Sequence, residues 1–332
     1  MKDFRSDNTL GASPEILDAI TRASAGSMTS YGNDEITARV RKRCSEIFGR
    51  EVDVFPVLTG TAANSLSIAA MTPPFGAVFC HEDAHIQRDE LGAVEFFSGG
   101  AKLILIAGAV GKLHPRDLER SIDEIRKSKK TAVPACVSLT NATEAGTVYT
   151  DDEIRALCEV ARGNGLRVHL DGARFANAFV SGARDIDGVD ILSFGASKNG
   201  TLAGDVIVVF NRALTEELSL RWHRAGQRLS KMRFLSAQLE AYLTNDLWLR
   251  NARHANAMAR RLRDAIGEAV EIVRPVDANI VFVRCPPPSG FLFGDWPIFG
   301  PDVYRIVMGF NTSEQDVDEL AQSLMRSRSI AT

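Results

Sequence analysis

Cysteine is scarce in this sequence, and its few copies are scattered. The chain has five cysteines among 332 residues, an odd number, and no two of them form a C-x-x-C pair. A disulfide framework needs paired cysteines and a structural zinc site needs closely spaced ones, so this spacing argues against both. The cysteines are Cys44, Cys80, Cys136, Cys158 and Cys285. We therefore predict neither a disulfide-bonded scaffold nor a metal site.

The sequence also lacks a large charge of one sign and any long apolar run. Lys and Arg number 39 against 42 Asp and Glu, which leaves a net charge of −3. This balance gives no reason to expect nucleic acid or an anionic membrane as a partner. The N-terminus has no apolar leader segment, and no window approaches about 18 uninterrupted apolar residues. A cytoplasmic protein without a membrane segment is the expectation.

Short β-rich runs recur along the first two thirds of the chain, with helical patterns between many of them. Several runs are apolar throughout, which suits strands covered on both faces. Thr150 with Glu153 three residues later predicts a capped helix, and Pro115 predicts the first turn of another. This alternation indicates an α/β domain with a mostly parallel, seven-stranded sheet. The predicted strands are 52–58, 76–80, 102–107, 132–139, 166–171, 190–194 and 205–210.

The character of the sequence changes after about residue 212. Residues 230–266 form an almost continuous helical pattern with two apolar stripes. Two further predicted strands, 279–285 and 304–310, are followed by a helix in which Thr312 and Gln315 fit a capping box. We predict a large α/β domain over residues 1–235, and a long helix with a small α+β domain over residues 236–332.

Three predicted strand ends carry residues suited to chemistry, and open parallel sheets bind ligands beyond such ends. "TGTAANSL" (59–66) opens a helix whose N–H groups suit a phosphate, with Thr61 adding a hydroxyl; a plain turn and N-cap is the alternative. Asp171 suits a protonated ring nitrogen, and the alternative is a helix N-cap paired with Arg174. Lys198 in "SFGASKNG" (193–200) is either a surface lysine or a nucleophile.

Two histidines, His81 and His85, follow a fourth predicted strand in "HEDAHIQRDE" (81–90). A lone loop histidine is more often structural than catalytic, and neither has a metal partner at helical spacing. The H-E-x-x-H spacing of zinc proteases is absent. These residues therefore predict no metalloprotease.

Taken together, the strand ends supply the three parts that pyridoxal phosphate requires: a lysine for a Schiff base, an acid for the pyridine nitrogen and a phosphate cradle. With these parts, the sequence resembles the low-specificity L-threonine aldolases, pyridoxal-phosphate enzymes of the aspartate-aminotransferase fold type (fold type I). The resemblance follows the family's order across nearly the whole chain. Its stretches are "FRSDN" (4–8), "YGND" (31–34), "TGTAAN" (59–64), "HLDGAR" (169–174), "SFGASKNG" (193–200) and "YRIV" (304–307).

The resemblance implies a carbon–carbon lyase that cleaves L-threonine, L-allo-threonine and related β-hydroxy-α-amino acids to glycine and an aldehyde. Lys198 would carry the cofactor as a Schiff base, and Asp171 would pair with the pyridine nitrogen. His85 would stack on the ring and is the first candidate for the base. The residues implied for the phosphate are Gly60, Thr61 and Ser197, and those implied for the substrate are Ser6, Arg174, Arg305 and Tyr31. Arg174 is implied for cofactor binding as well.

The resemblance further implies a homotetramer, a dimer of dimers with its active sites at the dimer interface and the N-terminal segment contributing there. Tyr31 would come from the neighbouring subunit, and so would a basic residue that reaches the phosphate. The candidates for that basic residue are Arg228, Lys231 and Arg233.

One segment departs from the family pattern. "LTNATEAGT" (139–147) has no histidine where many relatives carry Asn-Thr-His, which leaves the preferred diastereomer open. Rival reactions on the same scaffold are β-elimination, racemisation, serine-to-glycine cleavage with a folate carrier, and cleavage of phenylserine. A non-catalytic binding module is a rival of a different class. The intact set of Lys198, Asp171, Arg174 and Arg305 argues against that module.

Overall fold

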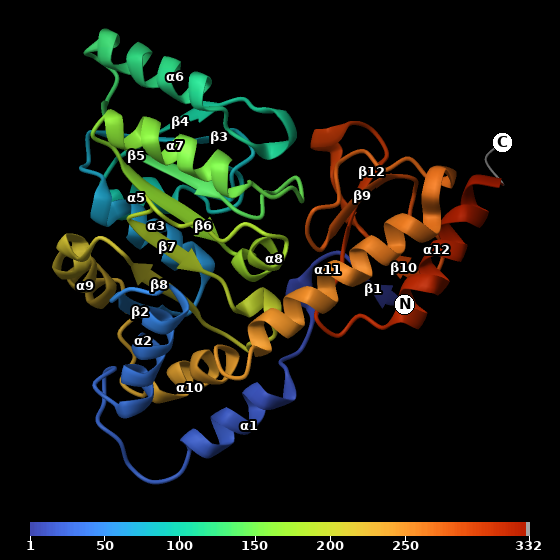
Figure 1. Ribbon diagram of the computed structural model, residues 1–332, viewed down its shortest axis with the longest axis horizontal. Helices are drawn as coiled ribbons and strands as arrows, with labels where there is room; N and C mark the ends of the chain where they lie inside the picture. Colours follow the sequence, from blue (N-terminus) through green and yellow to red (C-terminus); the bar gives the residue numbers. More distant parts are fainter. Residues whose placement is uncertain (330–332) are drawn as a thin grey trace.

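The computed structural model describes residues 1–329, and its largest element is a seven-stranded sheet (Figure 1). The strand order is β2-β8-β7-β6-β5-β3-β4, and neighbours run parallel except for the two pairs that β8 makes. The predicted mostly parallel, seven-stranded sheet is therefore confirmed. The strands are β2 Asp53–Val57, β3 Gly76–His81, β4 Lys102–Ile106, β5 Val133–Thr140, β6 Arg167–Gly172, β7 Ile191–Phe194 and β8 Asp205–Val209.

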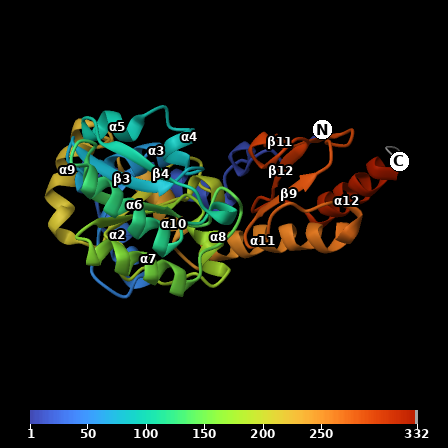
Figure 2. The same cartoon turned by 90° about the horizontal axis from the view of Figure 1, so that it is seen from above.

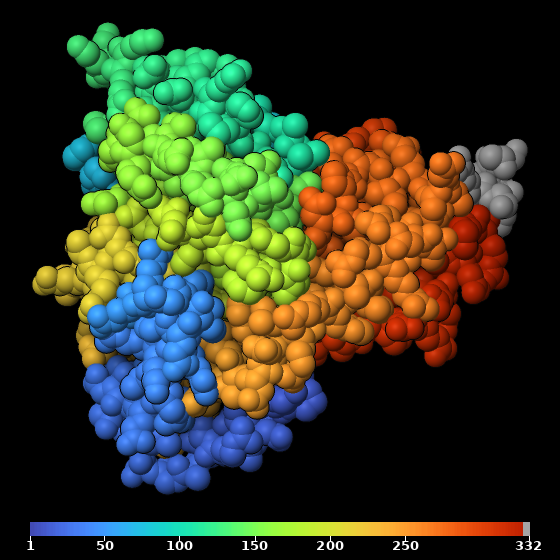
Figure 3. Space-filling view, viewed as in Figure 1, coloured from blue at the N-terminus to red at the C-terminus, as the bar shows by residue number. Residues whose placement is uncertain are grey.

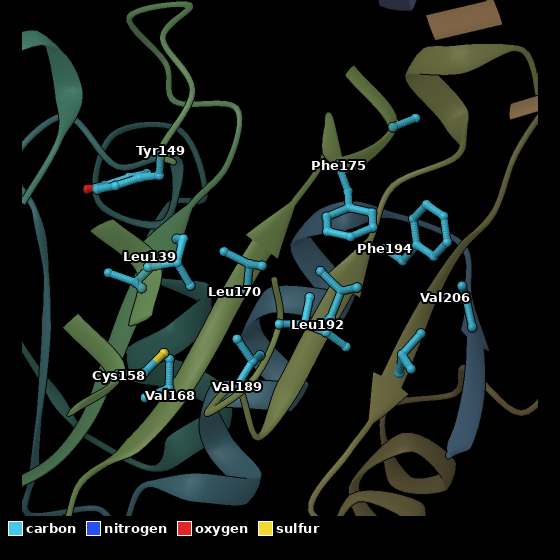
Figure 4. Close-up of a cluster of buried hydrophobic side chains, with 14 of the residues drawn as sticks. Leu139, Tyr149, Cys158, Val168, Leu170, Phe175, Val189, Leu192, Phe194 and Val206 are labelled. Atoms are coloured by element: carbon cyan, nitrogen blue, oxygen red, sulfur yellow. The ribbon is translucent and has the colours of Figure 1, made fainter. Parts of the chain in front are cut away.

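Helices cover both faces of this sheet, which explains why several of its strands are apolar throughout. In β3, Ala77 and Phe79 belong to one hydrophobic core, while Val78 and Cys80 belong to the other. Figure 4 shows strand side chains of the first core together with Cys158 of α7. The helices up to β8 are α1 Pro14–Ala23, α2 Glu35–Ile47, α3 Gly60–Met71, α4 His85–Arg88, α5 Ala93–Ser98, α6 Pro115–Ser128, α7 Asp151–Gly163 and α8 Phe175–Val180.

The helix starts read from the sequence are present in this domain. Thr150 Oγ1 accepts from the Glu153 N–H at 3.2 Å, and Glu153 Oε2 accepts from the Thr150 N–H at 2.7 Å. Pro115 occupies the first turn of α6, where its missing N–H costs no hydrogen bond. Both predicted helix starts are confirmed.

The segment 230–266 is two helices rather than one. α10 spans Arg233–Tyr242 and α11 spans Leu247–Ile266, after the shorter α9 at Thr215–Arg224. Between α10 and α11, Asn245 and Asp246 have φ of 51° and 56°, in the left-handed region that ends a right-handed helix. The apolar stripes continue across the break, which is why periodicity alone predicted a near-continuous helix.

A smaller unit follows, built on two short sheets and the helix α12 (Glu314–Ser329). One sheet is antiparallel, in the order β11-β12-β9, and the other pairs β1 with β10 in parallel. α11 runs from the large body along this unit (Figure 2). The predicted small α+β unit is confirmed. Its strands are β1 Lys2–Asp3, β9 Ile280–Arg284, β10 Phe291–Leu292, β11 Gly294–Asp295 and β12 Val303–Val307.

The hydrophobic cores change along α11. Trp248 and Ala252 pack in the core of the large sheet, whereas Met258 and Leu262 pack in the core of the small unit, which also takes Phe4 from the N-terminus. The small unit projects from one side of the larger body in the space-filling view (Figure 3). The predicted division at residues 235 and 236 falls at the start of α10, one helix before this change of core.

The cap of the last helix lies one residue later than predicted. Ser313 Oγ accepts from the Asp316 N–H at 3.1 Å, and Ser313 is therefore the capping residue. Thr312 Oγ1 instead accepts from the Gly309 N–H at 2.9 Å and closes the preceding turn. The predicted capping box of Thr312 and Gln315 is therefore wrong. The sequence places two hydroxyl residues side by side, and the second of them, Ser313, caps the helix. No helix within residues 1–329 is both long and apolar enough to cross a membrane.

Candidate active site

A pocket of about 310 Å³ opens beyond the carboxyl ends of β6 and β7, beside the start of α3. This is the edge at which open α/β sheets bind ligands. Six of the site residues predicted from sequence line it: Gly60, Thr61, His85, Asp171, Ser197 and Lys198. The other predicted site residues lie outside its lining: Ser6, Tyr31, Arg174 and Arg305.

Lys198 lies on a short turn directly after β7. Gly195 allows this turn to touch the end of β6, because a Cβ there would lie 2.4 Å from the Ala173 carbonyl oxygen. Asp205 Oδ1 accepts from the Ser197 N–H at 3.0 Å and holds the turn from the side of β8. Within the described chain, the Lys198 amino group has no hydrogen bond or ion pair. The turn therefore presents an unpaired amine to the pocket.

Asp171 lies at the end of β6 with both carboxylate oxygens held. Oδ1 accepts from the Ala173 N–H at 3.0 Å, and Oδ2 accepts from Asn64 Nδ2 at 3.0 Å. Burial raises the pKa of Asp171, while the positive charges of His85 and Lys198 act in the opposite direction. A buried acid of this kind is stabilised as a carboxylate when a cation lies against it.

His85 begins the short helix α4 and faces the pocket with part of its ring. Its Nδ1 lies 2.8 Å from Glu90 Oε1, and Glu90 is fully buried while the His85 side chain is 30% exposed. The same Glu90 oxygen accepts from Asn64 Nδ2 at 2.9 Å. The hydrogen bond to Glu90 raises the pKa of His85. A continuous series of hydrogen bonds thus links His85 to Asp171.

The start of α3 also lines the pocket. Thr59 caps this helix, since its Oγ1 accepts from the Ala62 N–H at 3.1 Å. The first N–H groups of a helix have no acceptor within the helix, so those of Gly60 and Thr61 remain available. With the helix dipole, they form a site suited to a phosphate or another anion.

Arg174 is buried next to the pocket and already holds a partner. Its Nε and Nη2 donate to the two oxygens of Asp7 at 2.8 and 2.9 Å. Asn279 Nδ2 donates to Asp7 as well, at 3.2 Å. A guanidinium carries five N–H donors, so three remain for another anion. Arg174 can therefore bind a substrate carboxylate only through its outer edge, because Asp7 occupies the inner one.

Arg305, on β12 of the small unit, is the second cation next to the pocket. Its Nη2 donates to the Arg5 carbonyl at 3.3 Å, and its Cζ lies 4.0 Å from the ring centroid of Trp296. Its Nε is buried with no hydrogen-bond partner among the described residues. Burial and the neighbouring charge of Arg174 lower the pKa of Arg305. An anion between the two guanidinium groups would relieve both effects.

Glu144 is a charged residue of this site that sequence reasoning missed. It lies in the segment between β5 and α7, where the neighbouring residues Thr143 and Ala145 are buried. Burial acts to raise the pKa of Glu144, but nearby positive charges outweigh it and lower the pKa. Those charges belong to Lys198, Arg174, His85 and Arg305.

The segment around Glu144 is firmly held. Thr143 and Thr147 exchange a side-chain hydrogen bond of 2.7 Å and a backbone hydrogen bond of 2.9 Å. The Asn141 N–H donates to the Asp171 carbonyl at 2.9 Å, which ties the segment to β6. Glu144 is thus a fixed acid among the cations of the site, in the stretch where the sequence lacks the family's histidine.

Tyr31 and the predicted basic residues are not among the lining residues of the pocket in their own chain. Tyr31 is 49% exposed, and its carbonyl accepts from Arg228 Nε at 3.2 Å. Arg233 Nη1 donates to the Gly26 carbonyl at 3.2 Å. None of the three candidates Arg228, Lys231 and Arg233 lines the pocket. The predicted contact of this surface with the active site of a neighbouring subunit stays a prediction.

The comparisons with known proteins agree with this geometry. The model of the family "Beta-eliminating lyase" matches residues 3–286. The low specificity L-threonine aldolase of Pseudomonas aeruginosa is 40% identical, over 97% of each chain.

Solved structures give the same result. The threonine aldolase of Leishmania major is 25% identical, with a TM-score of 0.92 over 99% of this chain and 100% of that one. An aspartate aminotransferase of Thermus thermophilus shares the fold, with a TM-score of 0.72 and 15% identity over 98% and 91% of the two chains. The resemblance drawn from the motifs is confirmed: the chain belongs to the β-eliminating lyase family and, within it, to the low-specificity L-threonine aldolases.

Proposed function

We propose that this chain is a pyridoxal-phosphate-dependent aldolase that cleaves L-threonine, L-allo-threonine and related β-hydroxy-α-amino acids to glycine and an aldehyde. The observation that carries the proposal is the unpaired amine of Lys198 in a pocket that is also lined by a helix N-terminus and by a buried acid, Asp171. Sequence relatives named for this activity support it.

The residues around the pocket fit the cofactor. The N–H groups of Gly60 and Thr61, with the Ser197 hydroxyl, would hold the phosphate. Asp171 would face the ring nitrogen, since a protonated nitrogen would keep this buried acid ionised. Lys198 would bind the aldehyde carbon covalently. When bound, pyridoxal phosphate supplies an electron sink for the electrons of the breaking Cα–Cβ bond.

Arg174 and Arg305 would orient the substrate. The three Arg174 donors that Asp7 leaves open suit the two oxygens of an α-carboxylate, and so does Arg305 Nε, which has no partner among the described residues. Holding the carboxylate fixes the rotation about the bond between the amino nitrogen and Cα. That rotation decides which bond at Cα can break. Ser6 caps the short helix Asp7–Thr9, and its predicted substrate contact would be made from there.

His85 is our assignment for the base that takes the proton of the β-hydroxyl. Its Nδ1 is directed to Glu90, which leaves Nε2 as the nitrogen available to the substrate. Loss of this proton drives the cleavage, because the oxygen then forms the aldehyde carbonyl as the Cα–Cβ bond breaks. General-base catalysis of this kind contributes about 10²- to 10⁴-fold to a rate.

Glycine release tests the proposal. Purified protein with pyridoxal phosphate should release glycine and acetaldehyde from L-threonine, L-allo-threonine or both, and Lys198→Ala should abolish turnover. Lys102→Ala removes an exposed lysine on β4 and should leave the activity unchanged. A keto acid with ammonia would instead indicate β-elimination, and the inverted amino acid would indicate racemisation. Normal turnover by Lys198→Ala would refute the proposal.

We further propose that the protein acts in the cytoplasm as a homotetramer, with active sites shared across a dimer interface. Exposed apolar side chains next to the pocket support the shared interface. Leu91 directly follows Glu90 and is completely exposed, and Leu202 lines the pocket with 62% of its surface exposed. A partner subunit that covers these side chains would remove apolar surface from water.

A further inference from the structure

His85, Glu90, Asn64 and Asp171 form a series of hydrogen bonds along the lining of the pocket. His85 Nδ1 and Asn64 Nδ2 both meet Glu90 Oε1, at 2.8 and 2.9 Å, and Asn64 Nδ2 also meets Asp171 Oδ2 at 3.0 Å. We propose that Glu90 is a positioning residue that holds His85 with Nδ1–H directed to Glu90 and Nε2 open to the substrate. The role of Nε2 in this inference rests on the proposed function.

The placement of Glu90 is fixed by the fold. Its side chain is fully buried, and its carbonyl accepts from the Ala93 N–H at 2.9 Å at the start of α5. His85 belongs to the single turn of α4, whose backbone closes with Asp89 N–H to His85 carbonyl at 2.9 Å. The imidazole therefore has a rigid acceptor on one side and the pocket on the other.

Asn64 determines which groups in this series of hydrogen bonds are acceptors. Its amide nitrogen lies between two carboxylates, so the nitrogen donates to both of them, and its Oδ1 has no partner among the described residues. Glu90 Oε1 is therefore an acceptor toward Asn64. A carboxylate oxygen accepts from two donors readily, and this leaves the shared proton on His85 Nδ1.

The state of the second carboxylate oxygen of Glu90 argues against a purely structural role for this residue. Glu90 Oε2 is buried and has no hydrogen-bond partner within residues 1–329. A buried acid with one unsatisfied oxygen costs stability, and an apolar side chain would fill the same space without that cost. Glu90 contacts His85, a histidine that lines the pocket, and this contact suggests a role in the chemistry of the site.

The charges around His85 also support a positioning role for Glu90. The hydrogen bond that His85 donates to Glu90 is the strongest influence that raises the pKa of His85, and burial acts against it. The other charged groups facing the ring come from three elements: Glu144 after β5, Asp171 on β6 and Lys198 after β7. The acids among them raise the pKa and Lys198 lowers it. Removing the Glu90 charge should therefore lower the pKa of His85.

Glu90→Gln tests this inference because it keeps the shape and the acceptor oxygen but removes the charge. In holoenzyme labelled with ¹⁵N-histidine, the His85 signal should show a proton on Nδ1 in the parent protein. The His85→Asn variant identifies that signal among the six histidines. In Glu90→Gln, the midpoint of the His85 titration should fall by about one pH unit. Glu82→Gln removes an exposed acid from the same segment and should leave the midpoint unchanged.

The pH dependence of the rate should shift in the same direction as the pKa of His85. His85 accepts a proton only when Nε2 is deprotonated, so a lower pKa should move the acid limb of kcat/KM for glycine release to lower pH in Glu90→Gln. The maximal rate should fall by less than the roughly 100-fold loss expected without a base. Wild-type and Glu90→Gln enzymes should show the same visible absorption of bound cofactor.

Each negative outcome has a distinct meaning. An unchanged His85 midpoint in Glu90→Gln, or a proton found on Nε2 rather than Nδ1, would overturn the positioning role. A shifted midpoint together with an unmoved acid limb would also overturn it, since His85 would not be the group that the rate reports. Absence of glycine release by the parent enzyme would refute the proposed function, while the histidine titration would still decide the role of Glu90.

Discussion

At the scale of single residues, the pocket works by pairing charges that are costly to bury alone. Asp7 pairs with Arg174 and Glu90 pairs with His85, whereas Asp171 has no ion pair among residues 1–329. A buried carboxylate without a cation is unstable as an anion. Asp171 is therefore the residue whose charge depends most on a ligand.

The first prediction concerns that acid. Asp171→Asn should keep the hydrogen bond from the Ala173 N–H but lose the negative charge that we propose to pair with the ring nitrogen. The cofactor should bind more weakly, and kcat should fall by two or more orders of magnitude, because an unprotonated ring is a poorer electron sink. Cofactor titration followed by visible absorption, with glycine release measured at saturating cofactor, checks both effects. A variant within a few-fold of the parent enzyme would rule out this role.

At the scale of elements, three strands of the sheet are joined by a buried histidine. His169 of β6 lies 2.9 Å from Ser138 Oγ of β5 and 2.9 Å from Ser193 Oγ of β7. Burial lowers the pKa of His169 to about 3. The imidazole is therefore neutral in the folded protein, and it is satisfied by the two hydroxyl groups next to it.

This arrangement predicts how stability depends on pH. An unfolded histidine binds a proton below about pH 6.5, while His169 in the folded protein does so only near pH 3. The unfolded state therefore binds more protons in that window, and stability falls as the pH falls, by up to about 1.4 kcal/mol per pH unit. The loss should be complete near pH 3, since both states are protonated below it.

His169→Gln is the matched variant, because glutamine can bond to both serines and does not titrate. Thermal unfolding followed from pH 7 to pH 5 should show a smaller loss of midpoint temperature in His169→Gln than in the parent protein. Equal losses in the two proteins would mean that other groups account for the acid sensitivity.

Local patterns explain which elements the sequence predicted well. The strands of the large sheet were found because their residues are apolar on both faces, and α7 was found through its capping residues Thr150 and Glu153. The break at Asn245 and Asp246 was not found, since the apolar stripes on either side keep their period across it. The shift of the last cap from Thr312 to Ser313 has a similar cause, because either hydroxyl satisfies the local pattern.

At the scale of the whole molecule, the proposed site combines residues of both units. The large sheet supplies Lys198 and Asp171, while Arg305 comes from the small unit. The exposed Tyr31 and its neighbour Arg228 lie outside this pocket, on a surface that the proposed assembly would bring to another subunit.

A complementation experiment tests that assembly. Lys198→Ala and Tyr31→Ala should each be nearly inactive alone. A mixed dimer would contain one site with both residues intact, so dissociating and reassociating the two variants together should restore part of the activity. Light scattering should also give a mass of four times the 36.2 kDa chain. Failure of every mixture to regain activity, with mixed assemblies present, would place Tyr31 outside the site of the neighbouring subunit.

The sequence by itself determined the sheet, the small second unit and the residues at the strand ends, because each leaves a local trace in apolar pattern, cap or motif. Lys198, Asp171 and the start of α3 were all identified in this way. Only the tertiary structure decided that Asp7 holds Arg174, that Glu90 holds His85 and that Glu144 faces the cations. Asp7 and Arg174 are 167 residues apart in sequence, so their pairing leaves no local pattern. Burial and charge are properties of the folded neighbourhood, and folding alone brings these groups together.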